Sequence, residues 1–382
     1  MDRVKQSIRH ERRTGMTISV FEVRNPRRIP TIILFYLIFF YFICGGAIPV
    51  HAELSRDNRA RTSDTVTVYL ENDLFGFENR DRYYTHGTKL SWISRDLAEY
   101  RDILTLPPWM LRRIERLPYV NDPGDIRTVS LSLGQNIYTP EDKGRRDLIS
   151  GDRPYAGVTY LGLGLQSKST RRMDTLELVL GIVGRHSYAE DCQIVIHREI
   201  GSIKPQGWEH QLHDEPLLNL YFERKRRFLE KKFSSGWGFD FIPHFGVAAG
   251  NMLTGLNMGG QARFGWNLPG DFGTYLIRPG SDSSAPVDDE DPRFHKPRQR
   301  VGVHFFIAVD GKAVARNIFL DGNTFRDSHS VDTEPLVADF IGGIGLIAHR
   351  FKFTYSYVYR TKEFREQRGD QQFGAVSLSY TF

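Results

Sequence analysis

The sequence is poor in cysteine. Of its two cysteines, Cys44 lies in an N-terminal apolar run, which leaves Cys192 as the only thiol in the rest of the chain. A single thiol cannot form an intramolecular disulfide, and it excludes zinc sites that are built from several cysteines. The chemistry of this protein must therefore depend on other residue types.

Long apolar runs are missing from most of the chain. After Val50, no run approaches the roughly twenty apolar residues that a transmembrane helix needs. The one exception, TIILFYLIFFYFICGGAIPV at 31–50, follows a stretch rich in Arg and Lys and ends at Val-His-Ala. This order is typical of a secretory signal peptide. We predict a signal peptide at 1–52, with translation starting at Met1 or Met16; the Gly-Gly-Ala-Ile-Pro end argues against a membrane anchor.

The predicted mature chain, 53–382, also lacks net charge. The whole sequence carries a net charge of +5, but residues 1–52 contain eight basic and three acidic residues, which leaves 43 of each sign in the remainder. The sequence pI of 9.0 therefore reflects the leader. A neutral chain gives no electrostatic reason to bind nucleic acid, so we expect no nucleic-acid partner.

What the mature chain does have is alternation of apolar and polar residues. In FKFTYSYVY at 351–359 every odd position is aromatic, and VSLSYTF at 376–382 alternates apolar residues with Ser and Thr up to a C-terminal Phe. Gly, Ser and Thr dominate the second face, as suits a barrel lumen, and aromatic residues recur near strand ends, as in the girdles of membrane barrels. These patterns favour a transmembrane barrel over a soluble sandwich.

The expected fold is all-β: a single-domain transmembrane antiparallel β-barrel of about twelve strands with a short helix in an extracellular loop. Bacterial single-chain barrels have an even number of strands of about 9–11 residues. We expect a surface loop at 268–299, which is rich in Gly, Pro and Asp, and a short helix within 96–126. The alternating segments lie at 65–73, 85–95, 127–138, 156–167, 173–184, 216–226, 238–250, 253–267, 300–315, 334–348, 350–360 and 373–382.

Polar chemistry is concentrated between the first two segments, in ENDLFGFENRDRYYTHG at 71–87. Asp73 ends the first predicted strand and Thr85 begins the second, so the hairpin places both oxygen ligands at one rim. Turns in barrels are often polar for structural reasons alone. By itself this stretch is only weak evidence of a functional site.

Two further segments carry candidate residues. GQNIYTPEDKGRRDLISGDRPYAG at 134–157 contains Lys143, Arg145 and two more arginines, which suit either a membrane rim or an oxyanion. Within 184–212, Ser187-x-x-Glu190 predicts a capping box and Gly201 a helix end. Such a helix places Gln193 and His197 on one face. Cys192 and His197 diverge by about 140° on a helix, which disfavours a thiol nucleophile.

Together the motifs END…DRYYTHG, GQNIYTP…GDRPYAG and Q-x-x-x-H-x-x-x-G…GW..QL resemble the outer-membrane lipid A 3′-O-deacylase family. The similarity covers about residues 65–382 and is strongest over 69–223. The resemblance implies a twelve-stranded barrel in a Gram-negative type outer membrane. It also implies that the barrel hydrolyses the ester of the 3′-linked acyloxyacyl chain of lipid A with the help of Ca²⁺.

The resemblance also implies residue roles. The catalytic His of the family falls on His197, and its Asn-Asp pair falls on Asn72 and Asp73. The motif hydroxyl falls on Thr85, and the basic residue falls on Lys143, with Arg145 as the alternative because the loop is shorter here.

These assignments form a coherent ester-hydrolysis site. His is suited to act as a general base, and Ca²⁺ prefers oxygen ligands such as those of Asp73 and Gln193. Asn72 and Lys143 add donors for an oxyanion, and Thr85 orients His197 or water, or acts as the nucleophile. We expect a monomer whose partners are lipid A in lipopolysaccharide and outer-membrane lipids. The alternatives are a phospholipase-type barrel and a non-enzymatic porin-like barrel.

Overall fold

The computed structural model describes residues 62–76, 83–122, 124–200, 203–274, 276–278, 280, 282–294 and 300–382. The predicted signal peptide at 1–52 and the predicted helix end at Gly201 lie outside these residues. No helix within the described ranges is long and apolar enough to cross a membrane.

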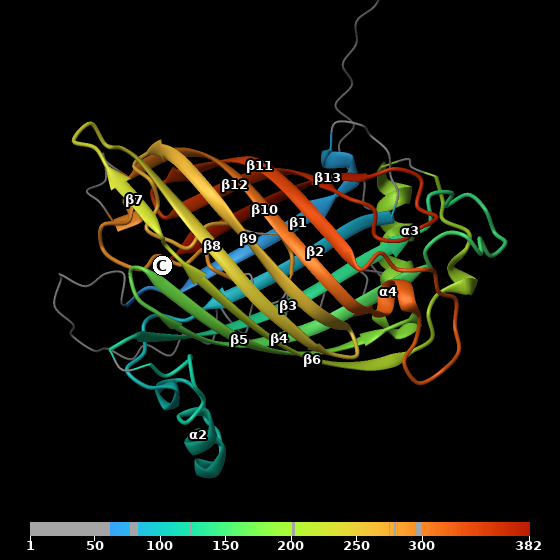
Figure 1. Cartoon of the computed structure of the whole chain (residues 1–382), viewed down its shortest axis with the longest axis horizontal. Helices are drawn as coiled ribbons and strands as arrows, with labels where there is room; N and C mark the ends of the chain where they lie inside the picture. The colour runs from blue at the N-terminus through green and yellow to red at the C-terminus, as the bar shows by residue number, and fades with distance from the viewer. Residues whose placement is uncertain are drawn as a thin grey trace, which may run out of the picture.

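Twelve antiparallel strands close into a barrel (Figure 1), as the sequence predicted. Neighbours in sequence pair along the sheet, β13 returns to pair with β1, and β6 pairs with β8 to complete the ring. The short strand β7 pairs only with β8 and lies outside the ring. The strands are β1 (Thr65–Asn72), β2 (Tyr83–Ile93), β3 (Ile126–Thr139), β4 (Ala156–Lys168), β5 (Arg172–Val183), β6 (Glu215–Arg226), β7 (Leu229–Lys232), β8 (Trp237–Gly250), β9 (Leu253–Trp266), β10 (Val301–Asn317), β11 (Leu336–Ala348), β12 (Phe351–Arg360) and β13 (Gln371–Thr381).

The alternating sequence pattern decides which side chains face out. In β12, Phe351 and Phe353 are exposed on the outer wall, whereas Lys352 and Thr354 are each 1% exposed inside the barrel. Successive strand residues point to opposite faces, so one apolar face meets lipid while the polar face lines the lumen. The structure confirms this prediction, and it places the protein's apolar surface on the outside of the barrel.

Helical segments are few and short. Among the described residues the α-helices are α2 (Pro108–Ile114), which confirms the helix expected within 96–126, α3 (Ala189–Ile200) and α4 (Ile318–Asp321). Single 3-10 turns occur at η3 (Asp73–Phe75), η4 (Tyr100–Asp102), η5 (Arg185–Ser187), η6 (Trp208–His210) and η7 (Pro292–Phe294). The connections that carry η3, α3 and α4 meet at one end of the barrel, here called the α3 rim. The other end, the C-terminal rim, holds Phe382 and the connection that contains α2 (Figure 1).

The segment between β9 and β10 is not the surface loop that its composition suggested. The described residues within 268–294, here called the plug, fold into the lumen from the C-terminal rim. Asp271 of the plug is fully buried and contacts Arg263 at 2.7 Å and Lys352 at 2.6 Å, while Asp282 pairs with Lys89 at 3.0 Å. Buried charges are stable only when they are paired. The prediction was wrong because the inward-facing cations of the strands supply the partners that water supplies to a surface loop.

Candidate active site

The first hairpin gathers polar groups at the α3 rim. The strand register places Asn72 opposite His86, and a bulge between Tyr84 and His86 interrupts the pairing of β2 with β3. Because of the bulge, Thr85 is not paired in that ladder, and its Oγ1 lies 2.7 Å from Oγ1 of Thr139. Bulges often re-aim side chains next to functional sites. Here the bulge turns Thr85 and His86 to the same side of the wall.

Asn72 holds this arrangement together. Its Nδ2 donates to the carbonyl oxygen of Thr85 at 2.9 Å and lies 3.4 Å from Nδ1 of His86. His86 in turn lies 2.6 Å from the hydroxyl of Thr88 through its Nε2. Asp73 follows directly as the first residue of η3 and is 1% exposed. Asn72, Asp73 and Thr85 therefore lie together at one rim, as the hairpin pattern predicted.

Helix α3 packs on the outer wall of the barrel above β3 and β4. Ala189, at the start of the helix, is 1% exposed and forms an apolar cluster with Ile137, Tyr155 and Trp208. Ile137 has the outward parity of β3, so the helix covers the lipid-facing side of the wall rather than the lumen. The side chains on the wall-facing side of α3 therefore lie between the helix and the outer wall.

Gln135 fixes the turn that leads into α3. Its Nε2 donates to the carbonyl of Ser187 at 2.7 Å, and the hydroxyl of Thr159 donates to the same carbonyl at 2.8 Å. The predicted helix is confirmed at Ala189–Ile200, but the hydroxyl of Ser187 donates to the carbonyl of Gly184 at 2.6 Å. The predicted capping box is therefore wrong, because the Ser187 hydroxyl stabilises the preceding turn.

His197 is held in one orientation. It is 4% exposed, and its Nδ1 lies 2.7 Å from the carbonyl oxygen of Ile203. A carbonyl only accepts hydrogen bonds, so Nδ1 carries the proton and Nε2 is the acceptor nitrogen of the neutral ring. His197 is also close enough to His86 for their charges to interact. Helix α3 therefore lies beside the first hairpin.

Gln193 lies one turn before His197 and is 1% exposed. Its Oε1 accepts a 2.8 Å hydrogen bond from the indole of Trp208. Its Nε2 has no hydrogen-bond partner among the described residues. A buried amide donor without a partner is costly, and such groups are often retained where a ligand supplies the acceptor.

The motif segment at 134–157 contributes a buried Lys to the same region. Lys143 is 6% exposed, whereas Arg145 is exposed. The carbonyl of Lys143 accepts from the backbone of Gln206 at 2.9 Å and from the hydroxyl of Tyr155 at 3.3 Å. The segment that follows α3 thus connects Lys143 with His197, whose ring is bound to Ile203.

Cys192 does not have the properties of a nucleophile. Burial raises the pKa of its thiol to about 11. The reactive form of cysteine is the thiolate, which is scarce at neutral pH when the pKa is this high. The structure agrees with the expectation that Cys192 is not catalytic.

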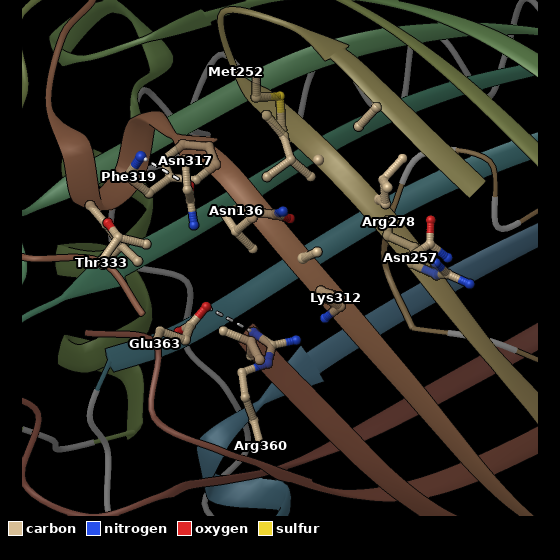
Figure 2. A pocket seen from close by; sticks show the side chains of 18 of the residues that line it. Asn136, Met252, Asn257, Arg278, Lys312, Asn317, Phe319, Thr333, Arg360 and Glu363 are labelled. Carbon is tan, nitrogen blue, oxygen red and sulfur yellow. Dashed lines mark hydrogen bonds and ion pairs between the residues drawn. The ribbon is translucent and has the colours of Figure 1, made fainter. Parts of the chain in front are cut away.

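A separate pocket lies inside the barrel (Figure 2). Its cavity volume is about 160 Å³, and it combines apolar residues such as Met252 and Phe319 with Arg278, Lys312 and Arg360. Each of these cations is paired: Arg360 with Asp339 at 2.7 Å, Lys312 also with Asp339, and Arg278 with Glu223 at 2.9 Å. The residues that line the pocket include none of the predicted site residues.

The site between α3 and the outer face of the barrel is here called the outer-wall site. Three residues that contribute to it were not predicted from the sequence. His86 belongs to the DRYYTHG motif and Trp208 to the GW motif, so both were visible as motif residues without an assigned role. Gln135 likewise belongs to GQNIYTP. The part of the chain described by the structure contains no group of three or more His, Cys, Asp or Glu side chains arranged to hold a metal. Any cation here needs neutral oxygen ligands beside Asp73.

Comparison with known families decides the identity of this barrel. The family model described as "Outer membrane protein LpxR" matches residues 34–382. The chain belongs to the LpxR family. This is the family of outer-membrane lipid A deacylases that the three motifs resemble, so the chain is an outer-membrane lipid A deacylase.

A solved structure with the same fold is LpxR. LpxR from Salmonella typhimurium matches with a TM-score of 0.65 at 18% sequence identity, covering 83% of this chain and 100% of that chain. The β-domain of the Bordetella autotransporter BrkA gives a TM-score of 0.37 at 10% identity, covering 84% of this chain and 99% of that one. The translocator domain of NalP from Neisseria meningitidis gives 0.33 at 8% identity, with 92% and 97% covered. A search of curated proteins found no match.

Proposed function

We propose that the outer-wall site hydrolyses the ester of the 3′-linked acyloxyacyl chain of lipid A, with His197 as the general base and Ca²⁺ as the cofactor. One observation carries the proposal: α3, which holds Gln193 and His197, packs on the lipid-facing side of β3 and β4 rather than in the lumen. A lipid in the surrounding leaflet reaches this side of the wall without leaving the membrane. The α3 rim is then the extracellular one, because lipid A occupies the outer leaflet.

His197 activates water in this proposal. With Nδ1 bound to Ile203, Nε2 accepts a proton from a water molecule whose oxygen forms a bond to the ester carbonyl carbon. The carbon–oxygen bond to the sugar then breaks, and the imidazolium returns its proton to the departing alkoxide. The products are a fatty acid and a sugar hydroxyl. The burial of His197 limits competing contact with bulk water.

Two donors are suited to the developing oxyanion. The Nε2 of Gln193 is buried and has no acceptor within the described ranges, and Lys143 brings a positive charge. Each well-placed donor of this kind typically contributes about 2.7–4 kcal/mol to catalysis. The Nδ2 of Asn72 already donates to the carbonyl of Thr85, so we assign Asn72 the positioning of the Thr85 bulge.

Asp73 is the residue that best fits a calcium ion. A buried carboxylate supplemented by backbone and amide oxygens is a donor set that Ca²⁺ prefers. Gln193 contributes to such a set only through the second lone pair of Oε1, since Trp208 occupies the first. When bound, Ca²⁺ supplies positive charge that polarises the ester carbonyl.

Thr85 is placed to position water rather than to attack the ester. Its Oγ1 shares a hydrogen bond with the hydroxyl of Thr139 rather than with a base. We also propose that the protein acts as a monomer, because one chain supplies every residue of the site.

The decisive experiment is mass spectrometry of lipid A after incubation with the purified barrel. We expect loss of the 3′-linked chain with Ca²⁺, no loss with EDTA, and recovery when Ca²⁺ is restored. His197→Ala and Asp73→Ala variants should be inactive while keeping the heat-dependent gel mobility of a folded barrel. Release of fatty acid from glycerophospholipids instead of lipid A would favour a phospholipase. A porin-like role is disfavoured because the plug occupies the lumen.

A further inference from the structure

The connection between β2 and β3 contains a second membrane-facing surface, far from the site. Tyr100 of this connection is 1% exposed and donates through its hydroxyl to the carbonyls of Val120 and Gln166. Around it, Leu97 and Val120 pack against Val129 and Leu165, which have the outward parity of β3 and β4. The connection therefore lies against the lipid-facing wall at the C-terminal rim.

Helix α2 projects sideways from this connection, beside the barrel rather than beyond its end (Figure 1). Ile114 and the following Leu117 are half-buried and pack against the cluster around Tyr100. Trp109, by contrast, is 62% exposed. This position, on the outside of the barrel near the C-terminal rim, leaves the exposed side of α2 uncovered by the barrel.

The exposed side of α2 has a distinctive composition. Trp109, Arg112 and Arg113 are spaced i, i+3 and i+4 on one face of α2, and Arg116 follows in the turn just after the helix. All three arginines are exposed, and none of their side chains has a hydrogen bond or an ion pair within the described ranges. The neighbouring Arg101 differs, since it pairs with Glu99 and Glu115.

We propose that this face of α2 binds the headgroups of anionic phospholipids. Guanidinium groups form bidentate hydrogen bonds with phosphate, and Trp is enriched where a membrane protein meets the headgroup region. Three unpaired positive charges beside an exposed indole are complementary to a negatively charged leaflet surface. The proposal does not depend on the hydrolase activity. Only the identity of the leaflet rests on the proposed function, which makes it the periplasmic one.

Tryptophan quenching in proteoliposomes tests the proposal. The signal of Trp109 is obtained by subtracting the fluorescence of a Trp109→Phe variant from that of the intact chain. We expect brominated phosphatidylglycerol to quench this signal at least twofold more than brominated phosphatidylethanolamine in vesicles of otherwise equal composition. High salt should reduce the difference, because exposed charges are screened.

Variants test whether the lipid preference depends on the arginine charges or only on where the helix lies. The triple variant Arg112→Gln, Arg113→Gln, Arg116→Gln should lose the preference for phosphatidylglycerol. Arg326→Gln, which removes an exposed arginine on the α3 rim, should keep it. Equal quenching by both lipids in the intact chain, or an unchanged preference in the triple variant, would overturn the proposal.

Discussion

The indole of Trp208 donates a 2.8 Å hydrogen bond to Oε1 of Gln193. This contact fixes which end of the amide is an acceptor and which is a donor, so Nε2 points its hydrogens away from Trp208. Trp208 is itself packed against Tyr155 at a ring distance of 5.1 Å. A residue outside α3 therefore orients a group on the helix.

Trp208→Phe should reduce turnover far more than stability. The variant keeps the ring packing but removes the donor, so Gln193 is free to rotate. A single neutral hydrogen bond contributes about 0.5–1.5 kcal/mol to folding, whereas a misplaced oxyanion donor costs about 10²–10³ in turnover. Rates of acyl release and thermal unfolding measured together test this. Trp237→Phe, on the exposed wall, is the control; equal activity in both variants would contradict the assigned role.

A charge at position 86 should shift the pH dependence of activity. His86 interacts electrostatically with His197. A permanent cation in His86→Lys disfavours the imidazolium form of His197, which lowers its pKa and moves the acid limb of the pH–rate profile to lower pH. His86→Glu should move it to higher pH. The neutral His86→Gln variant supplies the reference profile, and identical limbs in all three would show that the two rings do not communicate.

Gly157→Ala should separate α3 from the barrel. A Cβ at this position would lie 2.0 Å from the Cβ of Ala189, so the helix must move away from the wall. We expect loss of most activity and faster proteolysis within α3, with the barrel still folded. Gly342→Ala is the matched control, because a Cβ there meets nothing within 4 Å. Retained activity in Gly157→Ala would mean that the packing of α3 is not needed.

Cys192 should be slow to react and dispensable. With a thiol pKa of about 11, only about one molecule in a thousand carries the thiolate at pH 8. Intact-mass measurement should show slow alkylation by iodoacetamide in the native protein and rapid alkylation after denaturation. Cys192→Ala should retain acyl release. Rapid native alkylation, or an inactive Cys192→Ala variant that still folds, would assign the thiol a role after all.

Asp271→Asn should strongly destabilise the plug. The carboxylate pairs with Arg263, Lys352 and Arg293, so its loss leaves buried cations without full compensation. Breaking a buried pair of this kind typically costs about 3–5 kcal/mol. The temperature at which the folded gel mobility is lost should fall accordingly. Glu290→Gln removes a plug carboxylate whose partner Lys232 is exposed, and it should have little effect.

Most of the barrel could be predicted because alternation reports directly on the face that each residue occupies. All twelve predicted segments correspond to strands of the ring, with ends that differ by a few residues. The plug could not be predicted from its own composition, since Gly, Pro and Asp also suit a surface loop. A usable signal lay elsewhere, in Lys89 and Lys352 on inward faces, where an isolated charge is not tolerated.

The site was predicted unevenly for a similar reason. The hairpin brings Asn72 and Thr85 together through a local register, so their proximity follows from the sequence. The link between His197 and His86 depends on how α3 lies on the wall, which no local pattern specifies. Trp208 was missed because its role is a contact with Gln193 across a tertiary interface rather than a motif chemistry of its own.

The position of α3 on the outside of the wall has a kinetic consequence. A substrate that arrives by diffusion within the leaflet is encountered in two dimensions, so the relevant concentration is its mole fraction among neighbouring lipids. Diluting the substrate with detergent at constant total amount should slow the reaction, even though the enzyme and the number of substrate molecules stay the same. The reaction rate of this protein therefore depends on the composition of the lipid or detergent that surrounds it.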